Sequence, residues 1–194
     1  MCVLQDEVTM KIYIACSLTH VPRIHFREYT AHLHKLAGIL SSLHGHEVKY
    51  ALVDSDPQLG AKPIAERARL CYQWDCRMIQ ESDVVLAECS FPSIGLGIEL
   101  QIAAERGIPV VIAFRDFHGT RADAIRYVNP DHSEHDLQIG EGFVSLMALG
   151  MPNVMKVHRY SLDDDGIEQI AESIGLLQLS HLKVNKKPWQ GGPG

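Results

Sequence analysis

Residues 74–109 read WDCRMIQESDVVLAECSFPSIGLGIELQIAAERGIP, and this stretch decides the fold of the chain. The run from Val84 to Ala87 is short, rich in β-branched residues and without polar alternation, which is typical of a strand buried on both faces. A turn containing proline and glycine follows, and apolar residues then recur at helical spacing. The stretch is therefore a strand–loop–helix corner. In an open parallel sheet, ligands bind at such corners, beside the carboxyl ends of the strands.

Four residues of this corner are suited to binding or catalysis. Gly95 and Gly97 permit a positive φ and the close approach of another group to the backbone. The amides that open the helix, together with the Ser93 hydroxyl, can hold an anion. Glu99 lies in or near the first helical turn, where the helix dipole favours an ionised carboxylate, and such a carboxylate is a candidate nucleophile. An ordinary helix start with a dipole-favoured glutamate has the same pattern, so the corner alone leaves both interpretations open.

Strands alternate with helices along the whole chain. We expect strands at residues 11–16, 47–53, 84–87, 109–114 and 153–158, and further helices at 23–43, 63–80, 142–149 and 163–177. This alternation implies right-handed βαβ units and a parallel sheet covered on both faces. The predicted fold class is α/β: a single-domain, flavodoxin- or Rossmann-like three-layer sandwich with a five-stranded parallel sheet.

The pattern also suggests boundaries. Residues 1–9 are expected to be a leader, 10–180 the folded domain and 181–194 a flexible tail. The pattern breaks at about 116–142, where a polar, turn-rich segment interrupts the domain.

Composition excludes several classes of protein. The net charge of −6 provides no basic footprint for duplex nucleic acid. No run of about 18 apolar residues is present, so no membrane span is expected. The five cysteines are irregularly spaced without a C-x-x-C pair, which favours reduced thiols in a cytoplasmic protein. The scattered histidines do not predict a metal site.

The segment PSIGLGIE at 92–99, preceded by SDVVLAE at 82–88, resembles the signature of the nucleoside 2-deoxyribosyltransferase superfamily. Within it, the similarity is greatest to the branch of 2'-deoxynucleoside 5'-monophosphate N-glycosidases. The family pattern also has an aspartate eight residues before the one that opens the strand, and here that pair is Asp75 and Asp83. The resemblance covers roughly residues 11–115 and resumes around 143–160. Close relatives are shorter in between, so the polar segment is interpreted as an insertion.

The resemblance implies roles for individual residues. Glu99 would attack C1' of the deoxyribose, and Asp75 would protonate the departing base. Tyr13 would line the nucleoside pocket. Asp83 is also assigned to the substrate site, although a residue in front of a strand is equally suited to holding a backbone amide.

Three serines would hold a 5'-phosphate in this family. Ser17 and Ser93 match two of them, and Ser145 matches a third that a neighbouring subunit supplies, so a homodimer or higher homo-oligomer is implied. One departure concerns Thr19, where the nucleotide branch often has an arginine. Arg23 can reach the same place from the start of its helix, or the substrate lacks a 5'-phosphate.

The predicted function is cleavage of the N-glycosidic bond of a 2'-deoxynucleoside 5'-monophosphate through a glycosyl-enzyme intermediate, without a metal or organic cofactor. A transferase that exchanges bases between deoxynucleosides would use the same residues. A non-catalytic nucleotide sensor is a further alternative, although a pure binder needs neither Asp75 nor Glu99.

Overall fold

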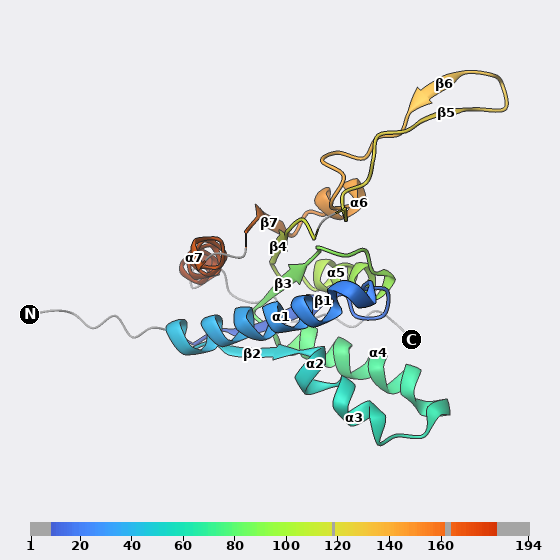
Figure 1. The fold of residues 1–194 in the computed structure, drawn as a ribbon. Helices are drawn as coiled ribbons and strands as arrows, with labels where there is room; N and C mark the ends of the chain where they lie inside the picture. Colours follow the sequence, from blue (N-terminus) through green and yellow to red (C-terminus); the bar gives the residue numbers. More distant parts are fainter. Residues whose placement is uncertain (1–8, 118, 162–163, 182–194) are drawn as a thin grey trace, which may run out of the picture.

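The computed structural model describes residues 9–117, 119–161 and 164–181. Five parallel strands form one sheet in the order β2-β1-β3-β4-β7, which is the flavodoxin-like order and confirms the predicted fold class (Figure 1). The strands are β1 (Lys11–Cys16), β2 (Glu47–Tyr50), β3 (Val84–Glu88), β4 (Val110–Phe114) and β7 (Val154–Arg159). Most of the expected leader and tail lies outside the described residues.

The central strands are buried because their apolar runs face helices on both sides. All residues of β3 and β4 are buried. β1 lies between β2 and β3, with Cys16 paired to Glu88 at its carboxyl end. The loops that follow β1 and β3 therefore start side by side at one edge of the sheet.

Two helices cover each face of the sheet. The helices α1 (Arg23–His44) and α7 (Asp164–His181) pack on one face, against side chains such as Ile12 and Leu86. The helices α4 (Ile64–Glu81) and α5 (Ile94–Glu105) pack on the other, against Tyr13 and Val85 among others. None of the helices in the described ranges is long and apolar enough to cross a membrane.

Glycines end two of these helices. Gly45 follows α1 with φ 63°, and its N–H bonds the carbonyl of Leu40. Gly107 follows α5 with φ 64°, and the chain then turns so that Ile108 N–H bonds the carbonyl of Ala103 at 2.9 Å. Both glycines adopt the left-handed conformation that stops a helix and reverses the chain.

The region after β2 differs from the prediction. The strand expected at 47–53 ends at Tyr50, and the polar segment expected as a loop forms two short helices, α2 (Ala51–Asp54) and α3 (Asp56–Gly60). The Asp54 carboxylate accepts the N–H of Tyr50 at 2.8 Å, and Pro57 lies in the first turn of α3. These local hydrogen-bonding and φ preferences favour helical turns over an extended strand.

Residues 119–142, the interruption in the pattern, form a projecting arm. Its strands β5 (Arg126–Val128) and β6 (Glu134–Asp136) pair antiparallel and extend away from the sheet (Figure 1). The helix expected at 142–149 is reduced to α6 (Leu146–Leu149), because Gly142 has φ 85° and the Ser145 hydroxyl caps the helix. Phe143 stacks on Phe114 with ring centroids 5.1 Å apart, which anchors the return of the arm to the sheet.

Candidate active site

Glu99 is a buried carboxylate in the middle of α5, beyond the first helical turn in which it was expected, and it faces Tyr13 in the middle of β1. The hydroxyl of Tyr13 donates to Glu99 Oε1 at 2.6 Å. Glu99 Oε2 is buried and has no hydrogen-bond partner among the described residues. Tyr13 points to this side because strand residues alternate, and its neighbours Ile12 and Ile14 pack on the opposite face. The structure thus orients one oxygen of the carboxylate and leaves the other, which is buried, without a hydrogen-bond partner.

The pKa of Glu99 is raised from 4.5 to about 7. Burial is the largest cause, the hydrogen bond from Tyr13 opposes it, and the nearby charge of Asp75 adds to it. Burial, with the charges of Glu99 and Asp75, raises the pKa of Tyr13 well above its ordinary value, so the phenol stays protonated and donates. Glu99 and Asp75 therefore lie within electrostatic reach of each other although they come from different helices. Perturbed carboxylates that influence one another are typical of catalytic sites.

Asp75 lies half-buried on α4. Its Oδ1 accepts the hydroxyl of Ser55 at 3.2 Å, and its Oδ2 accepts the thiol of Cys71 at 3.4 Å. Burial raises the pKa of Asp75, and these two hydrogen bonds moderate the shift. A carboxyl group with a raised pKa is better able to carry a proton to a leaving group.

Ser55 and Cys71 were not singled out from the sequence. Cys71 stands one helical turn before Asp75, which is a detectable spacing. Ser55 lies 20 residues from Asp75 and is brought there only by the unexpected helices after β2.

Ser93, Gly95 and Gly97 form the start of α5. Ser93 is the N-cap, and its hydroxyl oxygen accepts the N–H of Leu96 at 3.3 Å. The two glycines are helical residues with no positive φ, contrary to the expected turn. A β-carbon at Gly97 would meet no atom within 4 Å, and one at Gly95 would meet only the Ser93 hydroxyl at 3.6 Å. Because glycine has no side chain, these two positions leave open space outside the helix. They are not needed to avoid a clash within the protein.

Ser17 follows β1 at the same edge, but its hydroxyl is turned inward. The side chain is fully buried and donates to the carbonyl of Phe91, and the Ser17 N–H bonds the hydroxyl of Tyr29 at 3.2 Å. In this arrangement Ser17 ties the loop after β1 to the loop after β3, and Ser93 is the more accessible of the two serines.

Three other predicted residues lie apart from Glu99. Asp83 stands at the amino edge of the sheet, where its carboxylate accepts the N–H of Lys11 at 2.9 Å. Ser145 is exposed and caps α6 through the N–H of Met147. Arg23 is exposed at the start of α1, with its guanidinium 5.1 Å from the centroid of Phe26. Asp83 is therefore at the edge of the sheet opposite the ligand edge, whereas Ser145 and Arg23 are exposed residues at the starts of their helices.

A second buried carboxylate, Glu88, ends β3 on the α1 side. Its Oε1 accepts the hydroxyls of Ser90 and Tyr160, the latter at 2.9 Å, rather than pairing with an arginine. Tyr160 also bonds His32 Nε2 at 2.7 Å, and burial lowers the pKa of His32 to about 4. Ser90 in turn accepts the N–H of Arg115 at 2.9 Å. This network fixes the ends of β3 and β4 beside the site.

A surface cavity of about 380 Å³ lies elsewhere, between β2, α3 and α4. Its walls include Lys49, Lys62, Trp74 and Arg77, but neither Glu99 nor Asp75. The carboxylate chemistry, not this cavity, therefore locates the candidate active site. Among the described residues, no group of three or more His, Cys, Asp or Glu side chains is placed to hold a metal ion.

Comparison with known proteins gives relatives that match part of the chain. No family model matches the chain. A Methanococcoides burtonii protein named as a 2'-deoxynucleoside 5'-phosphate N-hydrolase is 37% identical over 68 residues, which is 34% of this chain and 54% of that relative. The 5-hydroxymethyl-dUMP N-hydrolase of Rattus norvegicus is 30% identical over 89 residues, or 40% of this chain and 55% of the relative. The chain thus spans about half the length of these curated relatives.

The solved structures extend the likeness to the fold. The crystal structure of a conserved protein from Enterococcus faecalis V583 superposes with a TM-score of 0.52 and covers 88% of this chain and 99% of its own. Its sequence is 17% identical, so the likeness concerns the fold alone.

Proposed function

We propose that the chain is a member of the nucleoside 2-deoxyribosyltransferase-like superfamily and that it hydrolyses the N-glycosidic bond of a 2'-deoxynucleoside 5'-monophosphate. The products would be the free base and 2-deoxyribose 5-phosphate. The observation that carries this proposal is the state of Glu99: one oxygen held by Tyr13, the other buried without a partner, and a second titratable carboxylate within electrostatic reach.

The proposed reaction has two steps. In the first, ionised Glu99 attacks C1' through Oε2, a C1'–O bond forms and the C1'–N bond breaks, while Asp75 gives its proton to the departing base. In the second, water attacks C1' and passes a proton to Asp75, and the Glu99 carboxylate is released. This is the two-carboxylate mechanism of retaining glycosidases applied to an N-glycoside.

The start of α5 is the proposed phosphate site. The open space outside Gly95 and Gly97 allows a phosphate to approach the amides of the first turn, and the Ser93 hydroxyl lies at the same end. The inward-facing hydroxyl of Ser17 supports a second candidate, a transferase acting on deoxynucleosides without the phosphate. In that case a second base, rather than water, would resolve the intermediate.

We also propose that the active unit is a homodimer. Ser145 is exposed at the start of α6, as expected for a residue that completes a neighbour's phosphate site. Next to it on α6, Leu146 and Met147 are exposed, at 46% and 87% of their surface, while the preceding Val144 is buried against the sheet. An apolar face of this kind is suited to a symmetric contact.

A product assay tests the proposed activity. Each deoxynucleoside and each 5'-monophosphate is incubated with the protein, and chromatography detects free base. Glu99→Gln should lose at least ~10³-fold in turnover, because an amide is a very poor nucleophile at C1'. Glu105→Gln is the matched control, since Glu105 is an exposed glutamate on the same helix. Full activity in purified Glu99→Gln would disprove the mechanism.

The same assay separates the two candidate activities. If Ser93 binds phosphate, Ser93→Ala should weaken transition-state binding of monophosphates by about 1.5–3 kcal/mol, the range for a hydrogen bond to a charged group. Its effect on nucleosides should be much smaller. Equal losses on both substrates would favour the transferase, and base exchange in the presence of a second base would then be the reaction to measure.

A further inference from the structure

The arm, residues 119–142, has an apolar face that the described residues of its own chain leave uncovered. Tyr127 pairs with His135 across the strands, and one step further the N–H of Leu137 bonds the carbonyl of Ile125 at 2.9 Å. Side chains alternate across a strand, so these four residues share one face. The rings of Tyr127 and His135, 5.9 Å apart, agree with this assignment.

The opposite face of the arm carries Arg126, Glu134 and Asp136, which pair with one another, beside the exposed Val128. Arg126 pairs with Glu134 at 3.3 Å and with Asp136 at 3.2 Å. By contrast, Ile125, Leu137 and Tyr127 expose 58%, 50% and 44% of their surface. One apolar and one polar face is the pattern of an antiparallel sheet that packs on a core.

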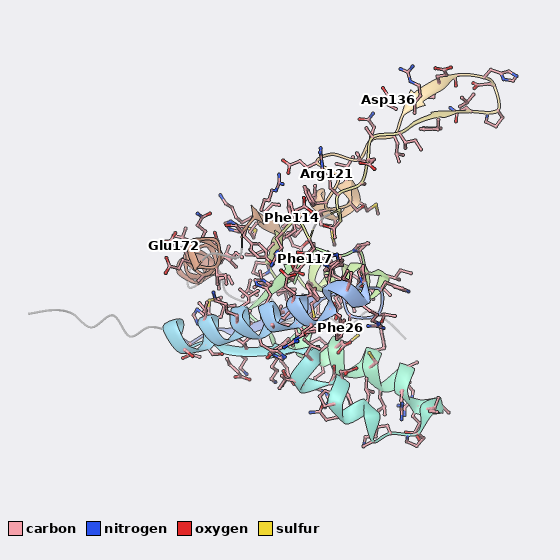
Figure 2. All side chains as sticks on the ribbon, viewed as in Figure 1. Phe26, Phe114, Phe117, Arg121, Asp136 and Glu172 are labelled. Atoms are coloured by element: carbon pink, nitrogen blue, oxygen red, sulfur yellow. The ribbon has the colours of Figure 1, made fainter. Side chains whose placement is uncertain are left out.

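No such core lies under the arm. The arm extends away from the sheet, with Arg121 near its base and Asp136 far from it (Figure 2). The ladder has only three residue pairs, and an isolated two-stranded hairpin is marginally stable in water. Among the residues that the structure describes, none supplies the cover that this apolar face needs.

The chain also carries a surface that matches this face. On β7, Met155 and Val157 share a face and expose 55% and 40% of their surface. Arg159 of the same face lies 4.7 Å from the ring centroid of Phe143, so the face adjoins the segment that leads into α6. We name the exposed residues Leu146, Met147, Met155 and Val157 the β7–α6 surface. Among the described strands β7 pairs only with β4, so its outer edge is open.

The two regions are also complementary in charge. The arm contains five acidic residues (Asp123, Asp131, Glu134, Asp136 and Glu141) and two basic ones (Arg121 and Arg126), a net charge of −3. On β7, Arg159 shares the face of Val157, whereas Lys156 pairs with Val111 on the opposite face, so the β7–α6 surface adjoins one positive charge and no acidic residue of this strand. Opposite charges around an apolar contact favour its formation and fix its register.

We propose that the arm of each chain lies on the β7–α6 surface of a second copy. One chain carries both halves of the contact, so a two-fold axis allows reciprocal exchange and closes the assembly as a dimer. From Ala122 to Asn129 the arm reaches about 23 Å at ~3.3 Å per residue, which is enough to cross several strands of a partner. The contact concerns assembly and does not rest on the proposed activity.

Two variants test the two halves of the contact by sedimentation over a range of concentrations. The arm variant, Ile125→Ser with Leu137→Ser, removes apolar surface and keeps the backbone. The surface variant, Met155→Glu, places a carboxylate where the acidic arm would lie. Each alone should weaken dimerisation by roughly tenfold or more, as truncation of central interface residues does. Ile24→Ser and Ile64→Ser are the matched controls, since these isoleucines are 85% and 82% exposed on other helices, and they should not weaken it.

Mixing the two variants gives the sharpest result. A mixed dimer contains one unaltered arm on one unaltered surface, whereas each variant's own dimer contains none. The mixture should therefore associate more tightly than either variant alone. The proposal would be overturned if the parent protein were a monomer, or if either variant dimerised as well as the parent. It would also be overturned if the control substitutions weakened dimerisation equally, or if the mixture associated no more tightly than each variant alone. If the protein forms a dimer without using the arm, this proposal fails, but the proposed α6 contact and the proposed activity are not affected.

Discussion

Tyr13→Phe should change how the activity depends on pH, rather than simply reduce it. The substitution keeps the ring in its buried place on β1 and removes the hydroxyl that donates to Glu99 Oε1 at 2.6 Å. That hydrogen bond lowers the pKa of Glu99 against the larger effect of burial. Without it, both oxygens of the carboxylate would lack a partner, and ionisation would become harder.

The size of the effect follows from the bond. A hydrogen bond to a charged group contributes about 1.5–3 kcal/mol, and 1.36 kcal/mol corresponds to about one pKa unit. The pKa of Glu99 should therefore rise from about 7 to about 8 or 9. At pH 7 the ionised fraction would fall from about half to roughly 1–10%, so kcat/KM should fall about 5- to 50-fold. The loss should disappear as the pH is raised above the new pKa.

The assay is the pH profile of kcat/KM for base release, together with carbon NMR of labelled glutamate to follow the carboxyl directly. Tyr72→Phe is the control, because this tyrosine is 59% exposed on α4. A loss of equal size at every pH would refute the reasoning, since Tyr13 would then act through shape or substrate contact. An unmoved Glu99 titration would refute it as well.

Four further outcomes follow from the same geometry. Asp75→Asn removes a charge that raises the pKa of Glu99, so the rising limb of the pH profile should move to lower pH, and turnover should fall. If the limb does not move, Asp75 does not affect the ionisation of Glu99. The pKa of Glu99 is raised from 4.5 in the folded chain, so stability is greatest below that pH and is lost as the pH rises through about 7. Denaturant titrations of Glu99→Gln should therefore show roughly 2–3 kcal/mol more stabilisation at pH 8 than at pH 5, and equal gains at both would contradict the assigned pKa. Gly97→Ala should raise stability by up to about 1 kcal/mol while increasing KM, and an unchanged KM would mean that substrate does not use the space beside it. Leu146→Asp should lower both the mass seen by light scattering and the activity. If the parent is a monomer and the variant is a folded, fully active monomer, the two subunits do not share a site.

The sequence predicts the structure best where the local preference of a segment for strand or helix agrees with its place in the parallel sheet. The unbroken apolar run of β3 and the glycines after α1 and α5 predicted the central strands, the helix ends and the parallel sheet. The neighbourhood of Glu99 and Asp75 was suggested by motif spacing, but the bond from Tyr13 was not, because it joins residues 86 positions apart. Such a contact depends on strand order and side-chain alternation together.

Other differences have identifiable causes. Asp83 was placed in the site, yet it precedes its strand, and a residue there must lie at the amino edge of the sheet, away from the ligand edge. The arm escaped prediction because its strands are three residues long and mostly polar, which gives no strand periodicity. The helices after β2 were missed because single turns carry little sequence signal.

The edge position of β7 has a consequence for how the molecule folds and opens. β7 joins the sheet only after the 39 residues that separate it from β4, and most of its residues are exposed, unlike those of β3 and β4. Closing a long loop costs entropy that one strand pairing must offset, so β7 with α7 should dock late and exchange its amide hydrogens early. A partner that lies on β7 would slow this local opening, and amide exchange would then depend on protein concentration most strongly in this strand.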